Sequence, residues 1–362
     1  MDLYVGVMSG TSIDGVDTVL VEFETGKVNE VGFCSVNFPE DLKNDLDMLV
    51  CCTAISLDKL GEIDHRLGLV YADCVNRLLR ESGCDRSMVK AIGCHGQTIF
   101  HAPGAKYPFT MQIGNGNIVA AKTGIPVVCD FRRMDMAYNG QGAPLACGFH
   151  QYFLNSCDER RAILNLGGIA NITILAENPN DVTGFDTGPA NCLMDNWIRQ
   201  CKSLSYDRDG EWAKSGKVID DLLRQMLREP YFTLRPPKST GRELFNMQWL
   251  QKFTGSYDDC DIQATLLELT VVTIANAVKA YDIDALYACG GGAFNRYLME
   301  RLAFYLPQIR ISTTLELGIP VQHVEAIAFA WMAQRRLQHL PGNLPSVTGA
   351  TNNAILGAFY LP

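Results

Sequence analysis

The first 25 residues follow a pattern of apolar strand, turn and second strand. Residues 3–8 are apolar, residues 9–15 are rich in glycine and hydroxyl side chains, and residues 16–23 alternate between apolar and polar. Alternation of period two beside a glycine-rich turn is typical of a β-hairpin. The same plan returns over residues 161–175, around a pair of glycines. A repeat of this kind predicts a duplicated domain.

Elsewhere the apolar positions recur every third or fourth residue, which predicts helices. These segments are residues 40–82, 118–122, 191–200, 218–227, 263–281 and 324–337. Shorter apolar runs predict buried strands at residues 89–94, 126–129, 182–185 and 285–289. Strands that alternate with helices favour an α/β fold with a partly parallel sheet in each half. We expect two domains, residues 1–150 and 151–362, because the second hairpin pattern begins near residue 160.

Charge and composition narrow the classes of partner. The chain has 362 residues, with 31 Lys and Arg against 40 Asp and Glu, for a net charge of −9. A negative protein repels phosphate backbones and anionic lipid surfaces at long range. We therefore expect neither nucleic acid nor a membrane as a partner. An anionic substrate would need a local cluster of hydrogen-bond donors.

Cysteine usage and the N-terminal sequence favour the cytoplasm. The 13 cysteines include no Cys-x-x-Cys pair, so we do not expect a structural zinc site. We expect free thiols in a reducing compartment. The N-terminal residues lack the basic and apolar regions of a signal peptide, and no run of 18 apolar residues predicts a membrane span.

Three glycine-rich turns are candidates for phosphate or nucleotide binding. They lie at residues 9–15, 165–171 and 289–295. Glycine lets the backbone turn tightly and approach a phosphate closely, and neighbouring N–H and hydroxyl groups can donate hydrogen bonds. Each turn alone is also compatible with a plain hairpin or strand-to-helix connection. Two similar hairpins in one chain favour a polyphosphate ligand more specifically.

Two carboxylates are candidates for catalysis. Asp186 follows the predicted strand 182–185 and precedes a predicted helix. Active sites of α/β proteins lie at the C-terminal edge of strands, so Asp186 is a candidate general base, although it could instead cap the helix. Glu325, at the start of the last long helix, is either a second active-site carboxylate or a solvated helix-start residue.

Further polar groups adjoin predicted strands. The sequence His95-Gly96-Gln97-Thr98 follows one strand, and Asp130-Phe131-Arg132-Arg133 follows another. Arg132 or Arg133 could bind a substrate carboxylate in a bidentate pair, whereas surface ion pairs and a structural hydrogen bond of His95 are the alternatives. The loop 238–245 could contact a ligand or cap a helix, and its sequence does not decide between these roles.

Taken in order, these motifs resemble the anhydro-N-acetylmuramic acid kinase family. The resemblance rests on residues 6–17, 95–98, 130–132, 140–144, 165–171, 184–189, 289–295 and 342–350. It implies the fold of the acetate and sugar kinase, heat-shock and actin superfamily. That fold is α/β, with two actin-like (RNase H-like) domains, each a mixed sheet flanked by helices, and with ATP in a cleft between them.

The resemblance also implies a reaction. ATP, with Mg²⁺, and water act together on 1,6-anhydro-N-acetylmuramic acid, and N-acetylmuramic acid 6-phosphate and ADP form during peptidoglycan recycling. The partners implied are therefore a small anhydro-sugar and ATP, and the resemblance leaves room for a homodimer. Opening of the internal ether bridge is similar to inverting glycoside hydrolysis, in which a carboxylate activates water for attack at C1.

The resemblance assigns roles to individual residues. Asp186 matches the catalytic base, and Glu325 is the second candidate catalytic residue. Residues matched to the sugar site are Ser12, His95, Gln97, Thr98 and Arg132. Residues matched to the ATP site are Gly10, Thr11, Ser12, Ile13, Asp14, Gly15, Val16, Asp17, Gly167, Gly168, Gly290, Gly291 and Asn295. Val7 stands where the superfamily usually has a metal-organising Asp, so Asp14 is the expected metal ligand, with Asp17 as the alternative.

Two other functions remain open at the level of sequence. A kinase of the same fold could phosphorylate an ordinary sugar hydroxyl, in which case Asp186 would deprotonate that hydroxyl and no water would be added. The chain could also be a non-catalytic module that changes conformation or assembles when it binds ATP. The polar motifs favour a small substrate over the second alternative.

Overall fold

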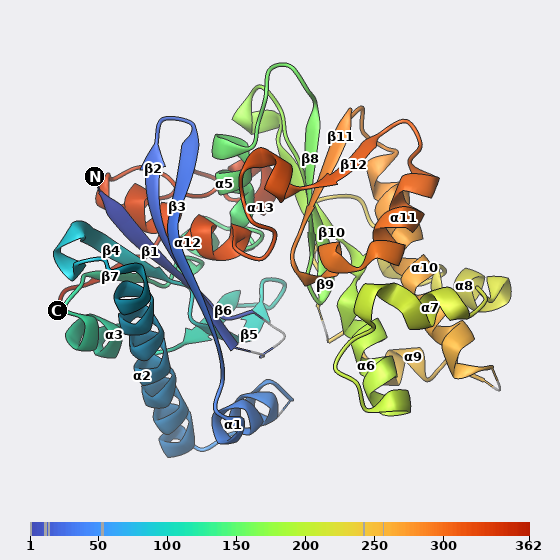
Figure 1. Cartoon of the computed structure of the whole chain (residues 1–362), viewed down its shortest axis with the longest axis horizontal. Coiled ribbons are helices and arrows are strands. Elements are labelled where there is room, and N and C mark those ends of the chain that lie inside the picture. The colour runs from blue at the N-terminus through green and yellow to red at the C-terminus, as the bar shows by residue number, and fades with distance from the viewer. Residues whose placement is uncertain (1, 11–12, 14, 52–53, 242, 256) are drawn as a thin grey trace. The chain divides into compact units, whose positions relative to one another are not determined.

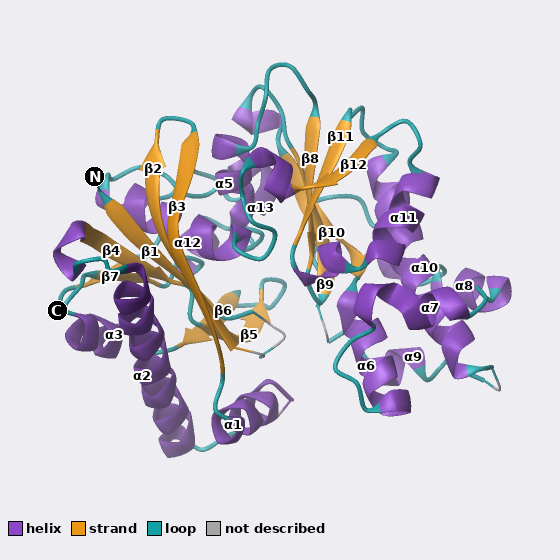
Figure 2. Cartoon of the chain, in the orientation of Figure 1, coloured by secondary structure: helices purple, strands orange, loops and turns teal. Residues whose placement is uncertain are grey.

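The computed structural model describes residues 2–362 apart from residues 11–12, 14, 52–53, 242 and 256. The chain forms two compact units, drawn in Figure 1 and Figure 2. Unit 1 comprises Met1–Phe153 and His323–Pro362, and unit 2 comprises Leu154–Gln322. The predicted division at residue 150 lies close to the first of these junctions. The second domain was expected to run to residue 362, but residues 323–362 pack in unit 1.

Unit 1 contains a six-stranded mixed sheet in the order β13-β7-β4-β1-β2-β3. Its strands are β1 (Leu3–Met8), β2 (Gly15–Glu24), β3 (Lys27–Asn37), β4 (Val89–Cys94), β7 (Val127–Cys129) and β13 (Ala358–Tyr360), and β5 (Gln97–Ala102) and β6 (Phe109–Ile113) form a separate hairpin. Its helices are α1 (Glu40–Cys51), α2 (Leu57–Ser82), α3 (Gly116–Thr123), α4 (Arg133–Ala137), α5 (Ala146–Phe153), α12 (Val324–Leu337) and α13 (Pro345–Thr348). The helical pattern over residues 40–82 thus forms two helices.

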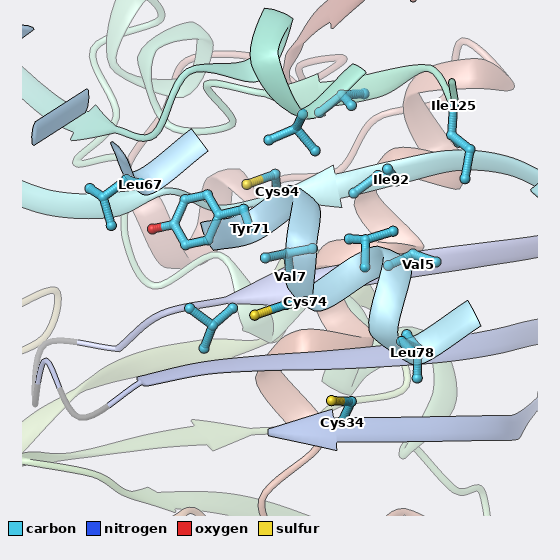
Figure 3. Packing of buried hydrophobic residues seen from close by; sticks show 14 of the residues in the cluster. Val5, Val7, Cys34, Leu67, Tyr71, Cys74, Leu78, Ile92, Cys94 and Ile125 are labelled. Carbon is cyan, nitrogen blue, oxygen red and sulfur yellow. The ribbon is translucent and has the colours of Figure 1, made fainter. Parts of the chain in front are cut away.

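The two faces of the central strand β1 pack against different helices. Val5 and Val7 belong to one buried cluster with Leu67 and Tyr71 of α2 (Figure 3). Because side chains alternate along a strand, Gly6 faces the other way, where a Cβ would stand 1.8 Å from the carbonyl oxygen of Ala326 in α12. The missing side chain allows α12 to lie directly on the sheet backbone. This contact explains why residues after 323 return to unit 1.

Unit 2 contains a five-stranded mixed sheet in the order β10-β9-β8-β11-β12. Its strands are β8 (Arg161–Leu166), β9 (Ile169–Ile174), β10 (Thr183–Pro189), β11 (Ala285–Cys289) and β12 (Arg310–Thr313). Its helices are α6 (Asn191–Lys202), α7 (Glu211–Ser215), α8 (Asp220–Met226), α9 (Met247–Leu250), α10 (Asp259–Val278) and α11 (Arg296–Tyr305). Helix α10 is long and apolar enough to cross a membrane, but 78% of that stretch is buried in the protein, as in a core helix.

The two sheets share one topology. In each, the first three strands are antiparallel neighbours, and the fourth and fifth strands continue parallel to the first. Strands β3-β2-β1-β4-β7 of unit 1 therefore correspond to β10-β9-β8-β11-β12 of unit 2. The α/β class, with a mixed sheet flanked by helices in each of two units, is confirmed. The repeat of hairpin patterns along the sequence is the start of this duplication.

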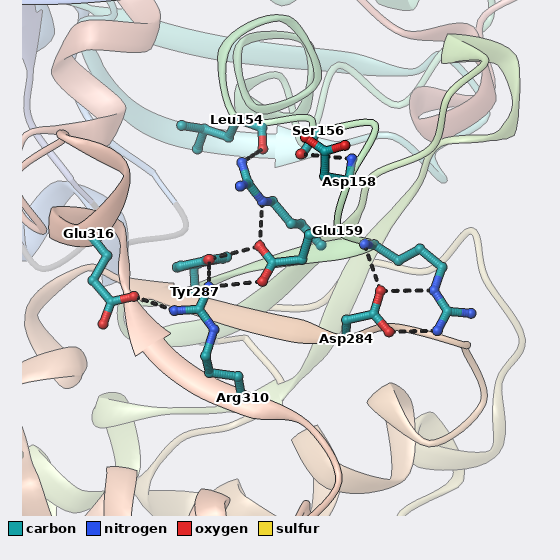
Figure 4. Close-up of polar contacts among 10 residues, drawn as sticks. Leu154, Ser156, Asp158, Glu159, Asp284, Tyr287, Arg310 and Glu316 are labelled. Atoms are coloured by element: carbon teal, nitrogen blue, oxygen red, sulfur yellow. Dashed lines mark hydrogen bonds and ion pairs between the residues drawn. The ribbon is translucent and has the colours of Figure 1, made fainter.

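A network of charged side chains joins the first residues of two strands in unit 2 (Figure 4). Glu159 accepts hydrogen bonds from Arg161 at 2.7 Å, from Tyr287 at 2.8 Å and from Arg310 at 2.8 Å. Arg161 begins β8 and Arg310 begins β12, on either side of β11. The network therefore lies at the opposite end of these strands from their glycine turns, and it helps to fix the register of the three parallel strands.

Candidate active site

The turn after β1 is anchored by contacts to two other elements. Ser9 Oγ lies 2.8 Å from the hydroxyl of Tyr71. The carbonyl of Gly10 accepts hydrogen bonds from the backbone N–H of Ile13 at 3.2 Å and from Nε2 of Gln97 at 3.3 Å. The side chain of Gln97 is fully buried, so its described contact supports the turn. Thr11, Ser12 and Asp14, expected to bind ATP, sugar or metal, lie outside the described residues.

The second half of the same motif forms the beginning of β2. Gly15, Val16 and Asp17 pair with β3, and Asp17 also lies opposite Met8 of β1. The side chains of Ile13 and Val16 are buried in the core, which leaves only their backbone groups for a ligand. Burial raises the pKa of Asp17, and a hydrogen bond with Ser35 partly opposes this rise.

His95 and Arg132 form a hydrogen-bonded pair in unit 1. Arg132 donates to His95 Nε2 from Nε at 3.1 Å and from Nη2 at 2.9 Å, and its Nη1 donates to the carbonyl of Gly142 at 2.7 Å. Burial and the charge of Arg132 hold the pKa of His95 well below its usual range. The imidazole is therefore neutral at physiological pH, accepts at Nε2 and carries its proton on Nδ1. The alternative that Arg132 forms a surface ion pair is wrong.

Glu325 lies in the first turn of α12, next to the residue that Gly6 contacts. Burial raises the pKa of Glu325, the charge of Arg132 opposes the rise, and Asp17 adds to it. These influences place Glu325 within electrostatic reach of Arg132 and Asp17. The structure therefore brings Asp17, His95, Arg132 and Glu325, which are far apart in the sequence, into one polar group of unit 1.

A cavity of about 210 Å³ adjoins this polar group. Its lining includes His95, Gln112, Asn117, Asp130 and Arg133, so hydrogen-bonding groups surround it. Thr98, another expected sugar-binding residue, lies on β5 and accepts a hydrogen bond from Gln112 Nε2 at 3.1 Å. The cavity has the polarity that a hydroxylated ligand requires.

The two glycine turns of unit 2 touch one another. Gly290 has a φ of +79°, and a Cβ there would stand 2.5 Å from Oδ1 of Asn165, at the end of β8. The carbonyls of Gly167 and Gly168 accept hydrogen bonds from Asn191 N at 3.1 Å and Cys192 N at 3.1 Å, at the start of α6. The parallel pairing of β8 with β11 thus brings both turns to one edge of the sheet.

Gly291 and Asn295 complete the third glycine motif. Gly291 begins a short 3₁₀ helix, and a Cβ on it would meet no other atom within 4 Å, so its backbone faces open space. Asn295 caps α11, because its Oδ1 accepts a hydrogen bond from the N–H of Leu298 at 3.0 Å. The described contact of Asn295 is therefore with its own helix.

Asp186 lies inside β10, opposite Asn171 of β9, where the strand register shifts. The expected strand 182–185 was too short, because the ladder continues to Pro189, and Asp186 does not follow the strand. The alternative that Asp186 caps the next helix is also wrong, since Ala190 occupies the N-cap position of α6. Burial raises the pKa of Asp186 to about 7, close to the value that suits a general base at neutral pH.

Residues 231–240, more than 40 positions later in the sequence, form hydrogen bonds with Asp186. The N–H of Thr240 donates to Asp186 Oδ2 at 2.9 Å. The hydroxyl of Tyr231 donates to the Asp186 carbonyl at 2.7 Å, and the N–H of Asp186 donates to the Lys238 carbonyl at 3.2 Å. The loop 238–245 thus contacts the candidate catalytic residue, a role that was not among the two considered. Asn246, just beyond it, caps α9, and contact of the loop with a ligand stays a prediction.

Comparisons with known proteins agree with these features. Residues 2–362 match the family described as anhydro-N-acetylmuramic acid kinase. Curated members from Photobacterium profundum and Shewanella pealeana are 50% and 51% identical, over 99% of this chain and 99% and 98% of their own lengths. This chain belongs to the anhydro-N-acetylmuramic acid kinase family. It is accordingly an enzyme, a phosphotransferase, and the resemblance drawn from its motifs is confirmed.

Solved structures offer only a weak comparison. Component A of the (R)-2-hydroxyglutaryl-CoA dehydratase of Acidaminococcus fermentans is 12% identical, with a TM-score of 0.48, over 91% of this chain and 96% of that chain. A likeness at this level carries no argument about fold or function.

The sequence analysis did not point to some residues that hold the site together. Asp135 is fully buried, and its carboxylate accepts hydrogen bonds from Gly142 N at 2.8 Å, Asn343 Nδ2 at 2.8 Å and Thr348 Oγ1 at 2.7 Å. It therefore ties two recognised motifs, residues 140–144 and 342–350, to the helix after Arg132. Tyr231, which contacts the backbone of Asp186, was also missed. The loop 238–245 was singled out, but its sequence did not show that it contacts Asp186.

Proposed function

We propose that this kinase hydrolyses the 1,6-anhydro bridge of anhydro-N-acetylmuramic acid and phosphorylates O6, with ATP as donor. The products are N-acetylmuramic acid 6-phosphate and ADP, which places the enzyme in peptidoglycan recycling. The observation that carries this proposal is Asp186, whose carboxylate has a pKa raised to about 7 by burial and lies on the sheet edge strand beside β9.

Asp186 is proposed as the base that activates water. The carboxylate accepts a proton from water as the water oxygen bonds to C1 of the sugar, and the bond between C1 and O6 breaks. O6 then bonds to the γ-phosphorus, and the bond between that phosphorus and the β,γ-bridging oxygen breaks, which releases ADP. The hydrogen bond from Thr240 N to Oδ2 at 2.9 Å fixes the carboxyl group, so a defined orientation toward water is available.

ATP binding is assigned to backbone groups of the glycine turns. In unit 1 these are the backbone groups of residues 10–17. In unit 2 they are the backbone groups of Gly167, Gly168, Gly290 and Gly291, and Asn295 is assigned to the same site. The proximity of Gly290 to the end of β8 supports a shared role for the two turns of unit 2. Phosphate binding through backbone N–H groups needs no local excess of Lys or Arg, which suits the negative net charge.

Mg²⁺ is proposed to accompany ATP and to neutralise phosphate charge. Magnesium in such sites takes one or two carboxylates besides phosphates and water. Asp14, the expected ligand, lies outside the described residues, among which no group of three His, Cys, Asp or Glu side chains forms a metal site. The alternative ligand, Asp17, is described near the start of β2, and a carboxylate oxygen suits a hard cation.

The sugar is assigned to the polar group of unit 1. Arg132 stays protonated, although burial lowers its pKa to about 10, and its charge would attract the lactyl carboxylate. His95, Gln97 and Thr98, together with Ser12, are proposed to bind the amino sugar. Glu325 is proposed as a second catalytic residue. A cytoplasmic location and a homodimer complete the proposal, with no nucleic acid or membrane as partner.

Replacement of Asp186 by Asn tests the proposed function. Asp186→Asn should lower kcat by about 10²–10⁴-fold, because general-base catalysis is lost, while calorimetry shows ATP binding unchanged. Asp181→Asn is the matched control, since Asp181 is exposed on the turn before β10 and should leave turnover unaltered. Retained turnover of Asp186→Asn would show that another group activates water.

A further inference from the structure

Segment 231–243 holds the backbone of Asp186 from two sides. Tyr231 donates its hydroxyl proton to the Asp186 carbonyl at 2.7 Å, and the Lys238 carbonyl accepts from the Asp186 N–H at 3.2 Å. Both peptide groups that flank the Asp186 side chain are therefore fixed by the same segment. β10 is the edge strand of its sheet, so backbone groups on its open side are available for these contacts.

The same segment also places an ammonium group against the ring of Phe185, the residue before Asp186. Nζ of Lys238 donates to the carbonyl of Tyr231 at 3.3 Å, 4.7 Å from the centre of the Tyr231 ring and 6.0 Å from that of Phe185. Phe185 directly precedes Asp186, and both aromatic rings are buried. Lys238 is itself partly buried. Contacts with a carbonyl and two aromatic faces hold the ammonium group of Lys238 in one position, whereas the ammonium group of a free surface lysine can move.

The charged groups that face Asp186 have opposite signs. Among the described residues, Lys238 favours the carboxylate form of Asp186, and Glu243 disfavours it. Glu243 is exposed, so water screens its charge more strongly than that of Lys238. The hydroxyl of Tyr231 faces the backbone of Asp186, and β9 presents the neutral Asn171 opposite. Arg242 lies outside the described residues.

We propose that Lys238 is a positioning residue for the catalytic base: its carbonyl fixes the backbone of Asp186, and its ammonium stabilises the carboxylate that accepts the proton of water. Glu243 acts against it, because its negative charge favours the protonated form of Asp186 and so opposes release of that proton. This inference rests on the proposed function, in which Asp186 is the base. Lys238 need not touch the sugar or ATP for this role.

The pH dependence of kcat/KM tests the charge of Lys238. A base must be ionised to act, so activity falls as pH drops through the pKa of Asp186. Lys238→Met removes the favourable charge and should move this acid limb upward by about one pH unit. Glu243→Gln should move it downward, and Lys238→Arg, which keeps the charge, should stay near the wild type. A merely structural role would not produce shifts of opposite sign.

A direct titration separates this inference from the proposed function. The ¹³C carboxyl signal of Asp186, assigned by its loss in Asp186→Asn, should titrate at higher pH in folded Lys238→Met than in the wild type. An unchanged midpoint in folded Lys238→Met would overturn the role of Lys238, whatever the activity. Full turnover of Asp186→Asn would instead overturn the role of Asp186 as the base, on which this inference rests. If Lys238→Met does not fold, Lys238→Gln, which also removes the charge, decides the question.

Discussion

At the scale of single residues, Asp186 lies where its ionised form is costly. Burial outweighs the hydrogen bond from Thr240 and the charge of Lys238, and raises the pKa of the carboxyl to about 7. A general base with this pKa is half ionised at neutral pH and can both accept and release a proton readily. The contact with Thr240 joins residues 54 apart in the sequence.

This cost predicts a dependence of stability on pH. The pKa of Asp186 is higher in the folded chain than in the unfolded chain, so the folded state binds more protons and loses stability as pH rises from about 4 to about 7. Asn carries no charge at any pH. Asp186→Asn should therefore gain stability over the wild type across this interval, by on the order of 4 kcal/mol at pH 8.

Thermal unfolding at pH 5 and pH 8 measures this difference. The gap in Tm between Asp186→Asn and the wild type should be wider at pH 8 than at pH 5. Asp181→Asn provides the control, because an exposed carboxylate loses little hydration on folding. A gap of the same size at both pH values would contradict the raised pKa of Asp186.

Sequence alone singled out Asp186 as a candidate, and its catalytic role stays a prediction, but sequence did not indicate its surroundings. A carboxylate between an apolar run and a helical pattern is a local feature, so it could be recognised without tertiary contacts. The hydrogen bonds from Tyr231 and Thr240 depend on how a distant loop folds back, and no spacing in the sequence encodes them. The contact of the buried Gln97 side chain with the carbonyl of Gly10 is likewise a tertiary contact that no spacing predicts, and its sugar-binding role stays a prediction.

At the scale of secondary structure elements, the position of α12 depends on glycine in β1. A Cβ on Gly6 would stand 1.8 Å from the carbonyl oxygen of Ala326, so the helix would have to move away from the sheet. Glu325 precedes Ala326 and would move with it. The polar group of Asp17, Arg132 and Glu325 therefore depends on the absence of one side chain.

Gly6→Ala should consequently destabilise unit 1. We expect a loss of about 2–4 kcal/mol in the free energy of unfolding, typical of overpacking against backbone that cannot retreat. Gly61→Ala is the control, since Gly61 lies on α2 with no atom within 4 Å of the added Cβ, and it should be neutral or gain up to about 1 kcal/mol. Urea unfolding measures both, and equal stabilities of the two variants would contradict the close packing of α12.

Element boundaries were predicted less well than element types. Apolar spacing continues across residues 40–82, so the sequence predicted one helical segment, but the structure has two helices there. The apolar period alone does not show where one helix ends and the next begins. The pattern also ended the strand at residue 185, whereas β10 runs to Pro189. Residues 186–189 look like a turn in sequence because they contain Gly and Pro, and pairing with β9 overrides that local preference.

At the scale of the whole molecule, the sequence showed the duplication of the hairpin pattern. It did not show that residues 323–362 pack in unit 1. Five strands of each sheet have the same order and directions, and both sets begin with the hairpin that the apolar pattern predicted. The pattern of residues 324–337 predicted a helix but contained no information on which sheet it covers. Contact through Gly6 assigns it to unit 1, so unit 2 is an insertion between Phe153 and His323.

The central claim is that one enzyme couples addition of water at C1 to phosphorylation at O6. Mass spectrometry of a reaction with 1,6-anhydro-N-acetylmuramic acid, ATP, Mg²⁺ and ¹⁸O-water, quenched early, tests it most directly. Authentic N-acetylmuramic acid 6-phosphate, incubated in ¹⁸O-water for the same time, controls for exchange at C1. We predict a product with one phosphoryl group and one ¹⁸O at C1, in excess of that exchange. A phosphorylated sugar that retains the anhydro bridge, or one without ¹⁸O above the control, would contradict the claim.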